Sequence, residues 1–361
     1  MPFTARRAAL RALLPGAGVD ALLVTDLVNV RYLSGFTGSN AALLVHADGD
    51  DRSRICTDGR YATQVAAEVP DLAAVIERAC AVELAKRAAK LSVERLGFES
   101  DVVTVDGYEA LVEAAGGVPL VRAPGLVQRL RAVKDAAEVE ALRRACSVGD
   151  AALAELLEAG GLRPGRTERE VALDLENRMR AHGADGPAFP TILAAGANSA
   201  VPHHRPTDAQ LQRGDLVKID FGALVDGYHS DMTRTLVLGP AADWQRELHA
   251  LVAEAQAAGR AALVPGAEVT RVDAAARDVV ELAGRGDQFV HGLGHGVGLQ
   301  IHEAPYVGRT GTGSLAAGMV VTVEPGVYLE GKGGVRIEDT LVVRDADPEL
   351  LTHTTRELLE V

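Results

Sequence analysis

The sequence predicts an α/β (α+β) protein of two domains, a small first domain over residues 1–130 and a duplicated second domain over residues 131–361. Three observations lead to this prediction. Short apolar runs alternate with helical patterns in the first third, and a long helical pattern begins near residues 131–136. The remainder repeats a helix-and-hairpin unit at an offset of about 100 residues.

Composition and charge exclude several classes of protein. Lys and Arg number 37 against 50 Asp and Glu, and the formal charge of −13 disfavours nucleic acid and anionic membranes as partners. No apolar run approaches the ~18 residues of a membrane span. The cysteines, Cys56, Cys80 and Cys146, are odd in number and widely spaced. This favours free thiols in a reducing cytoplasm and excludes a cysteine metal site.

The first domain reads as a small α/β domain. The opening segment, MPFTARRAALRALLPGAG, is expected to be an amphipathic helix rather than a signal peptide. Strands are predicted over residues 20–26, 41–47, 54–59, 73–77 and 94–99. Helices are predicted near residues 60–68, 81–91 and 106–115.

The second domain consists of two similar halves. One helical pattern ends in LRPG and is followed by Thr167 and Glu170, which have capping-box spacing; another ends in LVPG and is followed by Thr270. Each half then has a strand and a return strand, at 214–220 and 231–238 in the first half and at 318–324 and 338–343 in the second. We expect the halves to be related by a pseudo-twofold axis.

Four carboxylates occupy duplicated positions in these hairpins. Asp220 and Glu324 close the first strands, while Asp231 and Glu338 open the return strands. A turn at Asp226–Gly227 would place Asp220 beside Asp231. Each acid alone reads as a solvated strand end, but four acids brought together by packing of the halves require compensating cations. A two-metal centre satisfies that requirement.

Histidines supply the remaining polar groups. The segment HGLGHGVGLQIHEAP holds His291, His295 and His302, and its glycines favour an extended segment over a zinc-binding helix. His295 is the candidate metal ligand, and a phosphate-binding glycine loop is the weaker alternative because no Lys-Ser/Thr follows. His203 and His204 precede the first carboxylate hairpin in VPHHRP, where His203 is the functional candidate and an ordinary loop histidine the alternative.

Together these residues resemble the pita-bread metallopeptidases, a family that includes prolidase, aminopeptidase P and methionine aminopeptidase. The N-terminal motifs SGFTGSNAALLV and TDGRY look like the creatinase-type domain of the proline-directed branch, so the resemblance covers nearly the whole chain. It implies a creatinase-type N-terminal domain followed by a pita-bread catalytic domain.

The resemblance implies a set of metal ligands. Two divalent ions, manganese or cobalt with zinc as an alternative, would be bound by Asp220, Asp231, His295, Glu324 and Glu338. Asp231 and Glu338 would bridge the ions. Oxygen-rich ligation with one histidine agrees with manganese-like ions.

The resemblance also implies substrate contacts. His203 and His302 would contact the peptide and stabilise a tetrahedral intermediate, and Glu324 would relay the proton of an attacking water. His291 would line the pocket for the leaving proline, and Arg336 would orient the nearby carboxylates.

The expected activity is metal-dependent hydrolysis of the bond before proline in Xaa-Pro dipeptides or short peptides. The alternative is an aminopeptidase P that accepts longer peptides. In the prolidases that this chain resembles, an arginine shortly after this motif holds the carboxylate of the dipeptide, but here HEAP is followed by Tyr306, and the next arginine is Arg309. A non-catalytic pita-bread binding protein is a remote alternative, since all five ligand positions are filled. The resemblance further implies a homodimer in which the loop of residues 36–40 closes the partner's site.

Overall fold

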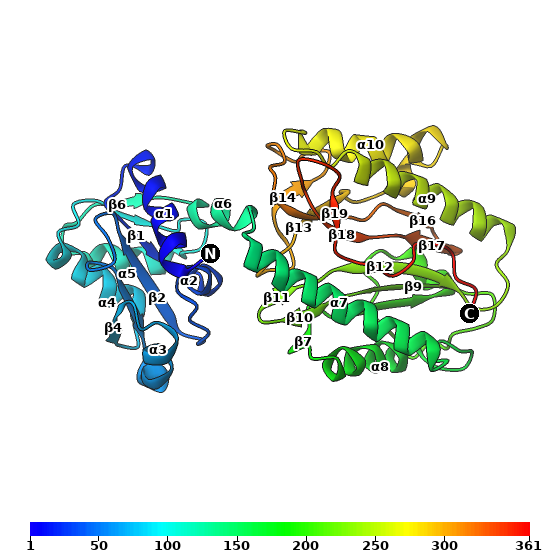
Figure 1. Cartoon of the computed structure of the whole chain (residues 1–361), viewed down its shortest axis with the longest axis horizontal. Helices are drawn as coiled ribbons and strands as arrows, with labels where there is room; N and C mark the ends of the chain where they lie inside the picture. Colours follow the sequence, from blue (N-terminus) through cyan, green and yellow to red (C-terminus); the bar gives the residue numbers. More distant parts are fainter. The chain divides into compact units, whose positions relative to one another are not determined.

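A six-stranded sheet organises residues Met1–Arg131, the first of the two units into which the chain divides (Figure 1). The computed structural model describes residues 1–361. The strands of this sheet are β1 (Ala21–Val24), β2 (Ala41–His46), β3 (Arg54–Thr57), β4 (Ala73–Ile76), β5 (Leu96–Phe98) and β6 (Leu120–Arg122). Their order is β4-β3-β2-β1-β5-β6, in which β2 pairs antiparallel with both neighbours and the other pairs are parallel.

Helices accompany this sheet along the chain. They are α1 (Phe3–Ala17), α2 (Leu27–Ser34), α3 (Ala62–Glu68), α4 (Cys80–Ala88), α5 (Val105–Ala114) and α6 (Leu126–Ala132), with 3₁₀ turns η1 (Gly59–Tyr61) and η2 (Ala89–Leu91). The five predicted strands, the three predicted helices and the N-terminal helix are confirmed. Helices α2 and α6 and strand β6 were not predicted; α2 begins at Leu27 and is capped by Asp26, whose carboxylate accepts a 2.9 Å hydrogen bond from the backbone N–H of Val28.

The second unit, Ala132–Val361, opens with two capped helices. The first half contains α7 (Ala136–Glu158), α8 (Glu168–Ala181), β7 (Gly186–Pro187), β8 (Ile192–Ala195), η3 (Gly196–Ala200), β9 (Leu216–Phe221), β10 (Ala223–Val225), β11 (Tyr228–His229) and β12 (Met232–Val237). The predicted capping box of Thr167 and Glu170 is confirmed at the start of α8. Asp135 and Glu138 form a second capping box at the start of α7.

The second half of this unit repeats the arrangement. It contains α9 (Asp243–Ala261), α10 (Val269–Leu282), η4 (Gly286–Gln288), β13 (Gly294–Gly296), β14 (Glu303–Val307), β15 (Val320–Val323), β16 (Gly326–Leu329), β17 (Gly333–Arg336), β18 (Asp339–Val342) and β19 (Glu349–Leu350). The glycine-rich segment is extended, as predicted, rather than helical. None of the helices in the chain combines the length and the apolar character that a bilayer span needs.

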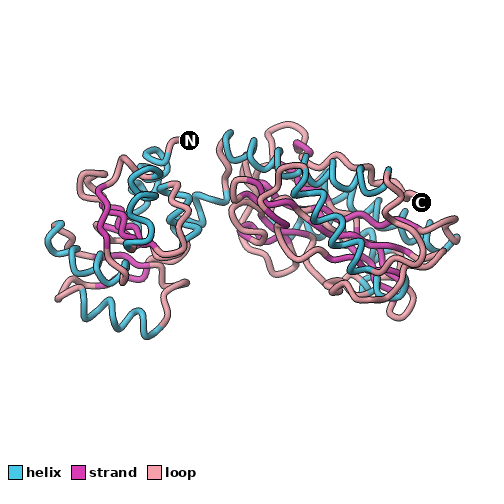
Figure 2. The backbone as a smooth tube through the Cα atoms, turned by 90° about the horizontal axis from the view of Figure 1, so that it is seen from below, coloured by secondary structure: helices cyan, strands magenta, loops and turns pink.

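Strands of the second unit lie between two helix pairs. In Figure 1, α7 and α8 lie on one side of these strands and α9 and α10 on the other, and Figure 2 shows the strands among the helices from below. The α8 residues Val171 and Leu175 are buried against the β9 residue Ile219. The α9 residue Val252 and the α10 residue Val272 are buried in a cluster with β15. Each helix pair thus covers one half of the repeat with an apolar face.

The two carboxylate hairpins differ in register. In the first, Asp220 pairs with Thr233, so Asp231 is a diagonal neighbour of Asp220 rather than the direct partner that the sequence predicts. The turn at Asp226–Gly227 does form, with both residues at positive φ, but it closes the short β10–β11 hairpin. The β10–β11 hairpin lies between the two carboxylates in the chain. Asp231 is therefore two positions away from Thr233, the residue that pairs with Asp220.

Candidate active site

One pocket of the second unit gathers the predicted metal ligands. It measures ≈160 Å³, and His203 and His302 line it. The other lining residues are the five predicted ligands, Asp220, Asp231, His295, Glu324 and Glu338, and the apolar residues Phe189, Ile192 and Ile301. The strand ends of both halves contribute, since Asp220 comes from β9 and Glu324 follows β15. Duplicated hairpins thus place acids from distant parts of the sequence at one site.

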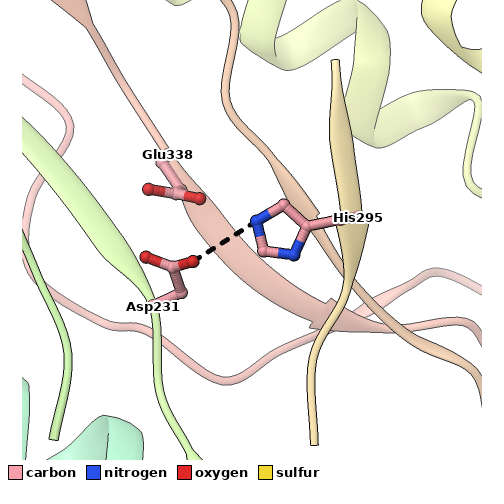
Figure 3. Close-up of side chains that lie close together, drawn as sticks. All are labelled: Asp231, His295 and Glu338. Carbon is pink, nitrogen blue, oxygen red and sulfur yellow. Dashed lines mark ion pairs between the residues drawn. The ribbon is translucent and has the colours of Figure 1, made fainter. Parts of the chain in front are cut away.

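Three ligands form the tightest group. Asp231, His295 and Glu338 each offer one ligand atom, and these atoms all lie within 4.8 Å of one another. Figure 3 shows the three side chains converging, His295 from β13 and Asp231 and Glu338 from the positions just before β12 and β18. Nε2 of His295 lies 3.5 Å from Oδ2 of Asp231 and 3.5 Å from Oε1 of Glu324. Such spacing suits oxygen and nitrogen atoms around a shared cation.

Glycines on both sides of His295 hold its strand close to its neighbours. A Cβ atom at Gly294 would lie 2.0 Å from the backbone oxygen of Thr322, and one at Gly296 would lie 2.2 Å from that of Ala304. No side chain fits at either position without moving backbone. The glycine-rich pattern therefore serves close packing of β13 against β15 and β14, which sets the depth of the His295 imidazole.

Mutual repulsion and burial perturb the acids strongly. Burial and Glu338 raise the pKa of Asp231 well above its usual value, and burial and Glu324 do the same for the pKa of Glu338. Burial raises the pKa of Glu324 to about 8. Oδ1 of Asp220 and Oε1 of Glu338 are buried without any hydrogen-bond partner. These carboxylates have free lone pairs and excess negative charge, so the site fits divalent cations.

The imidazole of His295 is prepared to act as a neutral ligand. Burial lowers the pKa of His295 to about 4, so the ring is uncharged at neutral pH. Its Nδ1 lies 3.0 Å from the backbone oxygen of Gly296. When Nδ1–H donates there, the lone pair of Nε2 faces Asp231 and Glu324, as in metal sites whose histidine is fixed by a second hydrogen bond.

Arg336 is buried and contacts several site groups. Its Nη2 donates to Oδ2 of Asp220, and its Nη1 lies 2.8 Å from the hydroxyl of Tyr328. Its Nε donates to the hydroxyl of Thr233 at 3.1 Å. Although burial opposes its charge, Tyr328 and Asp220 raise the pKa of Arg336 well above its usual value. The guanidinium thus offsets part of the negative charge and orients Asp220.

A larger pocket adjoins the metal-ligand cluster. It measures ≈590 Å³ and shares His203, His295, His302 and Glu324 with the smaller pocket, and His291 also lines it. No lysine or arginine is among its lining residues. The first arginine after HEAP, Arg309, is exposed and pairs with Glu281 at 2.5 Å. The pocket can therefore take a neutral peptide segment beside the predicted metal ligands.

His291 is anchored within this larger pocket. Its Nε2 lies 2.8 Å from the hydroxyl of Tyr328, and its ring packs edge-on against Phe289 with centroids 5.2 Å apart. Burial lowers the pKa of His291 to about 3, so its imidazole is neutral. An uncharged ring held between two aromatic side chains presents a mostly apolar wall to a ligand.

The two neighbouring histidines of VPHHRP separate in the structure. His203 is exposed and lines both pockets, whereas Nε2 of His204 lies 2.8 Å from Oε2 of the buried Glu168. Nζ of Lys218 contributes to the same loop because it donates to the backbone oxygens of Val201 and Pro202 at 2.6 and 3.2 Å. The loop that presents His203 is thus fixed from both sides.

Sequence reasoning did not identify Lys218, Tyr328 or Thr233. All three are buried and contact site residues rather than the pocket itself. Lys218 had a detectable signal, since a lysine inside the apolar run LVKID needs a partner when buried. Thr233 and Tyr328 are ordinary strand residues by pattern, so only the register shows their neighbours.

Comparison with known families follows the two units of the chain. Residues 140–345 match the sequence pattern of metallopeptidase family M24, and residues 6–133 match that of the Creatinase/Prolidase N-terminal domain. The first range contains every residue of the site described above.

Curated relatives and solved structures agree with this match. The Xaa-Pro dipeptidase of Pyrococcus furiosus is 37% identical over 343 residues, which cover 94% of this chain and 95% of that protein. A solved Xaa-Pro dipeptidase from Bacillus anthracis is 36% identical with a TM-score of 0.94, covering 99% of this chain and 100% of that one. A solved X-Pro aminopeptidase from Thermotoga maritima is 34% identical with a TM-score of 0.88, covering 95% and 98%.

Proposed function

Because the chain belongs to metallopeptidase family M24, we propose that it is a prolidase that hydrolyses the peptide bond preceding proline in Xaa-Pro dipeptides. The observation that carries this proposal is the buried group of four carboxylates and one imidazole beside a pocket lined by further histidines. That arrangement combines a cation site with groups able to bind a peptide at the same place.

The family binds divalent metal ions, and the residues proposed to hold two of them here are Asp220, Asp231, His295, Glu324 and Glu338. Asp231 and Glu338 are the proposed bridging ligands. When bound, such ions polarise a scissile carbonyl and acidify a water molecule. The ligand set is mostly oxygen with a single nitrogen, which favours manganese or cobalt, with zinc as the alternative.

Proton transfer is assigned to Glu324. Its carboxylate borders both pockets, and it is the one acid among the lining residues of the larger pocket, so it lies between the proposed metal ligands and the space for a peptide. This carboxylate would accept a proton from the attacking water and then donate that proton to the nitrogen of the leaving proline.

His203 and His302 are assigned to the substrate carbonyl. Both are exposed and line both pockets. Burial, followed by the neighbouring His203, lowers the pKa of His302, which favours its uncharged ring. Imidazole N–H groups in this position would donate hydrogen bonds to the oxygen on which negative charge develops. His291, held by Tyr328, is assigned to the wall around the proline ring, and Arg336 to the orientation of Asp220.

An X-Pro aminopeptidase is the second candidate, and the pocket itself favours it. A dipeptidase has to recognise the free carboxylate of its substrate, yet the pocket of this chain holds no lysine or arginine. The experiment compares kcat/KM for an Xaa-Pro dipeptide with that for the matched Xaa-Pro-Xaa tripeptide. A prolidase turns over the dipeptide at least about tenfold more efficiently, a discrimination of roughly 1.4 kcal/mol, whereas a preference for the tripeptide would establish the aminopeptidase.

A homodimer would supply the missing cation. The proposed dimer places residues 36–40 of one subunit over the partner's pocket. That loop is well fixed within its own unit, since Ser39 Oγ lies 2.6 Å from the Tyr61 hydroxyl and Asn40 donates to Asp58 at 2.7 Å. Asp58 also binds Arg60, whose side chain is 63% exposed and available to a peptide carboxylate. The proposed location is the cytoplasm, in keeping with three buried, unpaired cysteines.

A further inference from the structure

The segment of residues 289–293 carries His291 into the larger pocket, although it is neither helix nor strand. It follows the 3₁₀ turn η4 and ends where β13 begins at Gly294. His291 and Gly292 both line the pocket. Because the segment has no regular ladder of hydrogen bonds, its backbone N–H and C=O groups need partners elsewhere. Those partners decide where the imidazole of His291 lies.

Two side chains of α10 supply these partners. Asp273 and Arg277 lie one helical turn apart and are 1% and 5% exposed. Nε and Nη2 of Arg277 donate to the two carboxylate oxygens of Asp273, at 2.7 and 2.8 Å. A bidentate pair of this kind fixes the orientation of both side chains. The remaining donors and the acceptor of the pair therefore point in fixed directions.

The pair makes three hydrogen bonds to the backbone of the segment. Nη1 of Arg277 donates to the backbone oxygen of Phe289 at 2.9 Å, and Nη2 donates to that of His291 at 2.7 Å. Oδ1 of Asp273 accepts a 3.0 Å hydrogen bond from the backbone N–H of Leu293. Every second residue of the segment is thus bonded to the pair, and His291 is the middle one.

Contacts between rings extend this hold to the side chain of His291. The guanidinium of Arg277 lies 4.0 Å from the centroid of the Phe289 ring, which in turn packs against the His291 ring. Nε2 of His291 lies 2.8 Å from the hydroxyl of Tyr328, and Arg336 donates to the same hydroxyl. A shift of the backbone at His291 would break its contact with Phe289 or with Tyr328.

The cost of burying this pair favours a role in fixing conformation. Taking two charges out of water is expensive, and an apolar pair of similar volume often stabilises a fold equally well or better. The same face of α10 has fully buried apolar residues at Val272, Ala276 and Val280. The charged groups among them make directed hydrogen bonds to the segment, which apolar side chains cannot make.

We propose that the Asp273–Arg277 pair is the positioning element that holds His291 in the pocket wall and thereby sets the affinity for the proline end of the substrate. This inference rests on the proposed function, which assigns His291 to the wall around the proline ring. Neither residue of the pair lines either pocket, so the pair acts through the segment and does not touch the substrate.

The test is the double variant Asp273→Asn/Arg277→Met in the metal-loaded enzyme. It removes both charges together, so neither is left buried without a partner, and the asparagine oxygen can still accept from Leu293. That bond is worth keeping because the backbone oxygen of Leu293 accepts a 2.8 Å hydrogen bond from the N–H of Glu324. With the Xaa-Pro substrate that the unmodified enzyme cleaves best, we expect KM to rise about tenfold while kcat and metal content stay unchanged.

Combination with His291→Ala separates positioning from a general loss of structure. His291→Ala alone should raise KM by a similar factor. Adding the double variant should raise KM no further, because the pair then has no ring to position. An unaltered KM in the double variant, or effects that simply add in the combined variant, would overturn the proposal.

Arg166→Met is the matched control in the same unit. Arg166 also pairs with a carboxylate of its helix region, that of Asp174 at 2.9 Å, and donates to the backbone oxygens of Gly161 and Glu170 at 2.9 and 3.1 Å. It lines neither pocket. This variant loses the same kinds of hydrogen bond, and its KM should equal that of the unmodified chain.

A crystal structure of the double variant tests the positioning role without any activity. The proposal expects residues 289–293 to shift and the His291 ring to lose its contact with the Tyr328 hydroxyl. A His291 ring that keeps this contact would overturn the proposal. If the unmodified metal-loaded enzyme cleaves no Xaa-Pro peptide, the proposed function fails, and the crystal structure still decides whether the pair positions His291.

Discussion

The hydroxyl of Thr233 donates a 2.8 Å hydrogen bond to Oε2 of Glu338, while the other oxygen of this carboxylate has no partner in the protein. Thr233 also accepts a hydrogen bond from Nε of Arg336. The threonine therefore fixes the rotation of the proposed bridging carboxylate and leaves one of its oxygens free for a cation. Residues of this kind orient metal ligands without touching the metal.

Thr233→Val removes this hydrogen bond and keeps the side-chain volume. We expect metal affinity and kcat/KM to fall by about 10–100-fold, the usual consequence of losing a ligand-orienting partner. Metal titration and steady-state kinetics measure the two effects. The matched control is Thr191→Val, since the Thr191 hydroxyl is buried without a partner and its loss should leave both quantities unchanged. Equal behaviour of the two variants would exclude an orienting role.

Glu338→Gln and Asp231→Ala separate metal binding from folding. Both variants should lose bound metal and activity, because each removes a negative charge from the proposed bridging position. Without metal, however, the variants should melt at or above the temperature of the EDTA-treated unmodified chain, since repulsion among the buried acids is relieved. Metal analysis and thermal melting measure this. Two metals per chain in either variant would remove that residue from the bridging role.

His203→Ala and His302→Ala test the proposed contacts to the carbonyl oxygen. We expect kcat to fall by about 10²–10³-fold, the scale for loss of one preorganised donor or proton-transfer partner. Metal content should not change, because neither ring belongs to the group of three close ligands. His182→Ala is the matched control, because the His182 ring lies 2.8 Å from Glu155 and lines neither pocket. Loss of metal in either of the first two variants would identify that histidine as a ligand.

Much of the fold could be predicted because its elements carry strong local signals. The capping box of Thr167 and Glu170 marks the start of α8, and the apolar runs around β1 and β2 are buried throughout. Helix α2 was missed because it is short and its cap, Asp26, follows directly on a strand. Its stability depends on packing within the unit, which local propensity does not report.

The candidate site was predictable to the level of residues but not of register. Repetition of the hairpins placed Asp220, Asp231, Glu324 and Glu338 together, and all four line one pocket. The diagonal offset between Asp220 and Asp231 follows from the intervening β10–β11 hairpin, which the sequence indicated only as a turn. The contacts of Thr233, Tyr328 and Lys218 depend on that register.

The stability of the metal-free protein should fall with rising pH, whereas that of the metal-loaded protein should not. In the metal-free fold the pKa of Glu324 is raised to about 8, and those of Asp231 and Glu338 are raised well above their usual values. The folded state therefore holds protons that the unfolded chain, with carboxyl pKa values near 4, has already released. This contribution to stability is present below about pH 4 and is lost as the pH rises toward about 8.

Metal ions replace these protons, so the loaded enzyme should not lose stability over the same range. We expect the difference in melting temperature between manganese-loaded and EDTA-treated protein to widen from pH 5 to pH 8. Differential scanning calorimetry at matched ionic strength measures it, and taking the difference cancels titrations elsewhere in the chain. A gap that stays constant with pH would contradict the assignment of the acids to a common cation site.

Arg60→Gln tests whether a partner subunit recognises the carboxylate of the substrate. Arg60 binds Asp58 through two hydrogen bonds of 2.9 and 2.8 Å and remains 63% exposed, so it is held in place with donors to spare. If it meets the peptide carboxylate in the dimer, the substitution should raise KM for an Xaa-Pro dipeptide about tenfold and leave kcat unchanged.

The control for this test is Arg52→Gln, which removes another exposed arginine of the same unit, one that pairs with Asp48 and is 48% exposed. Its kinetics should match those of the unmodified chain. Sedimentation must show a dimer for all three proteins, because a monomer could not bring Arg60 of one subunit to the other's pocket. A fully active, selective monomer, or an Arg60→Gln enzyme with unaltered KM, would show that the carboxylate is recognised within the catalytic unit. The larger pocket of that unit is lined by no lysine or arginine. Histidines such as His203 would then be the donors available to it, and a preference for longer peptides should follow from their weaker attraction for a carboxylate.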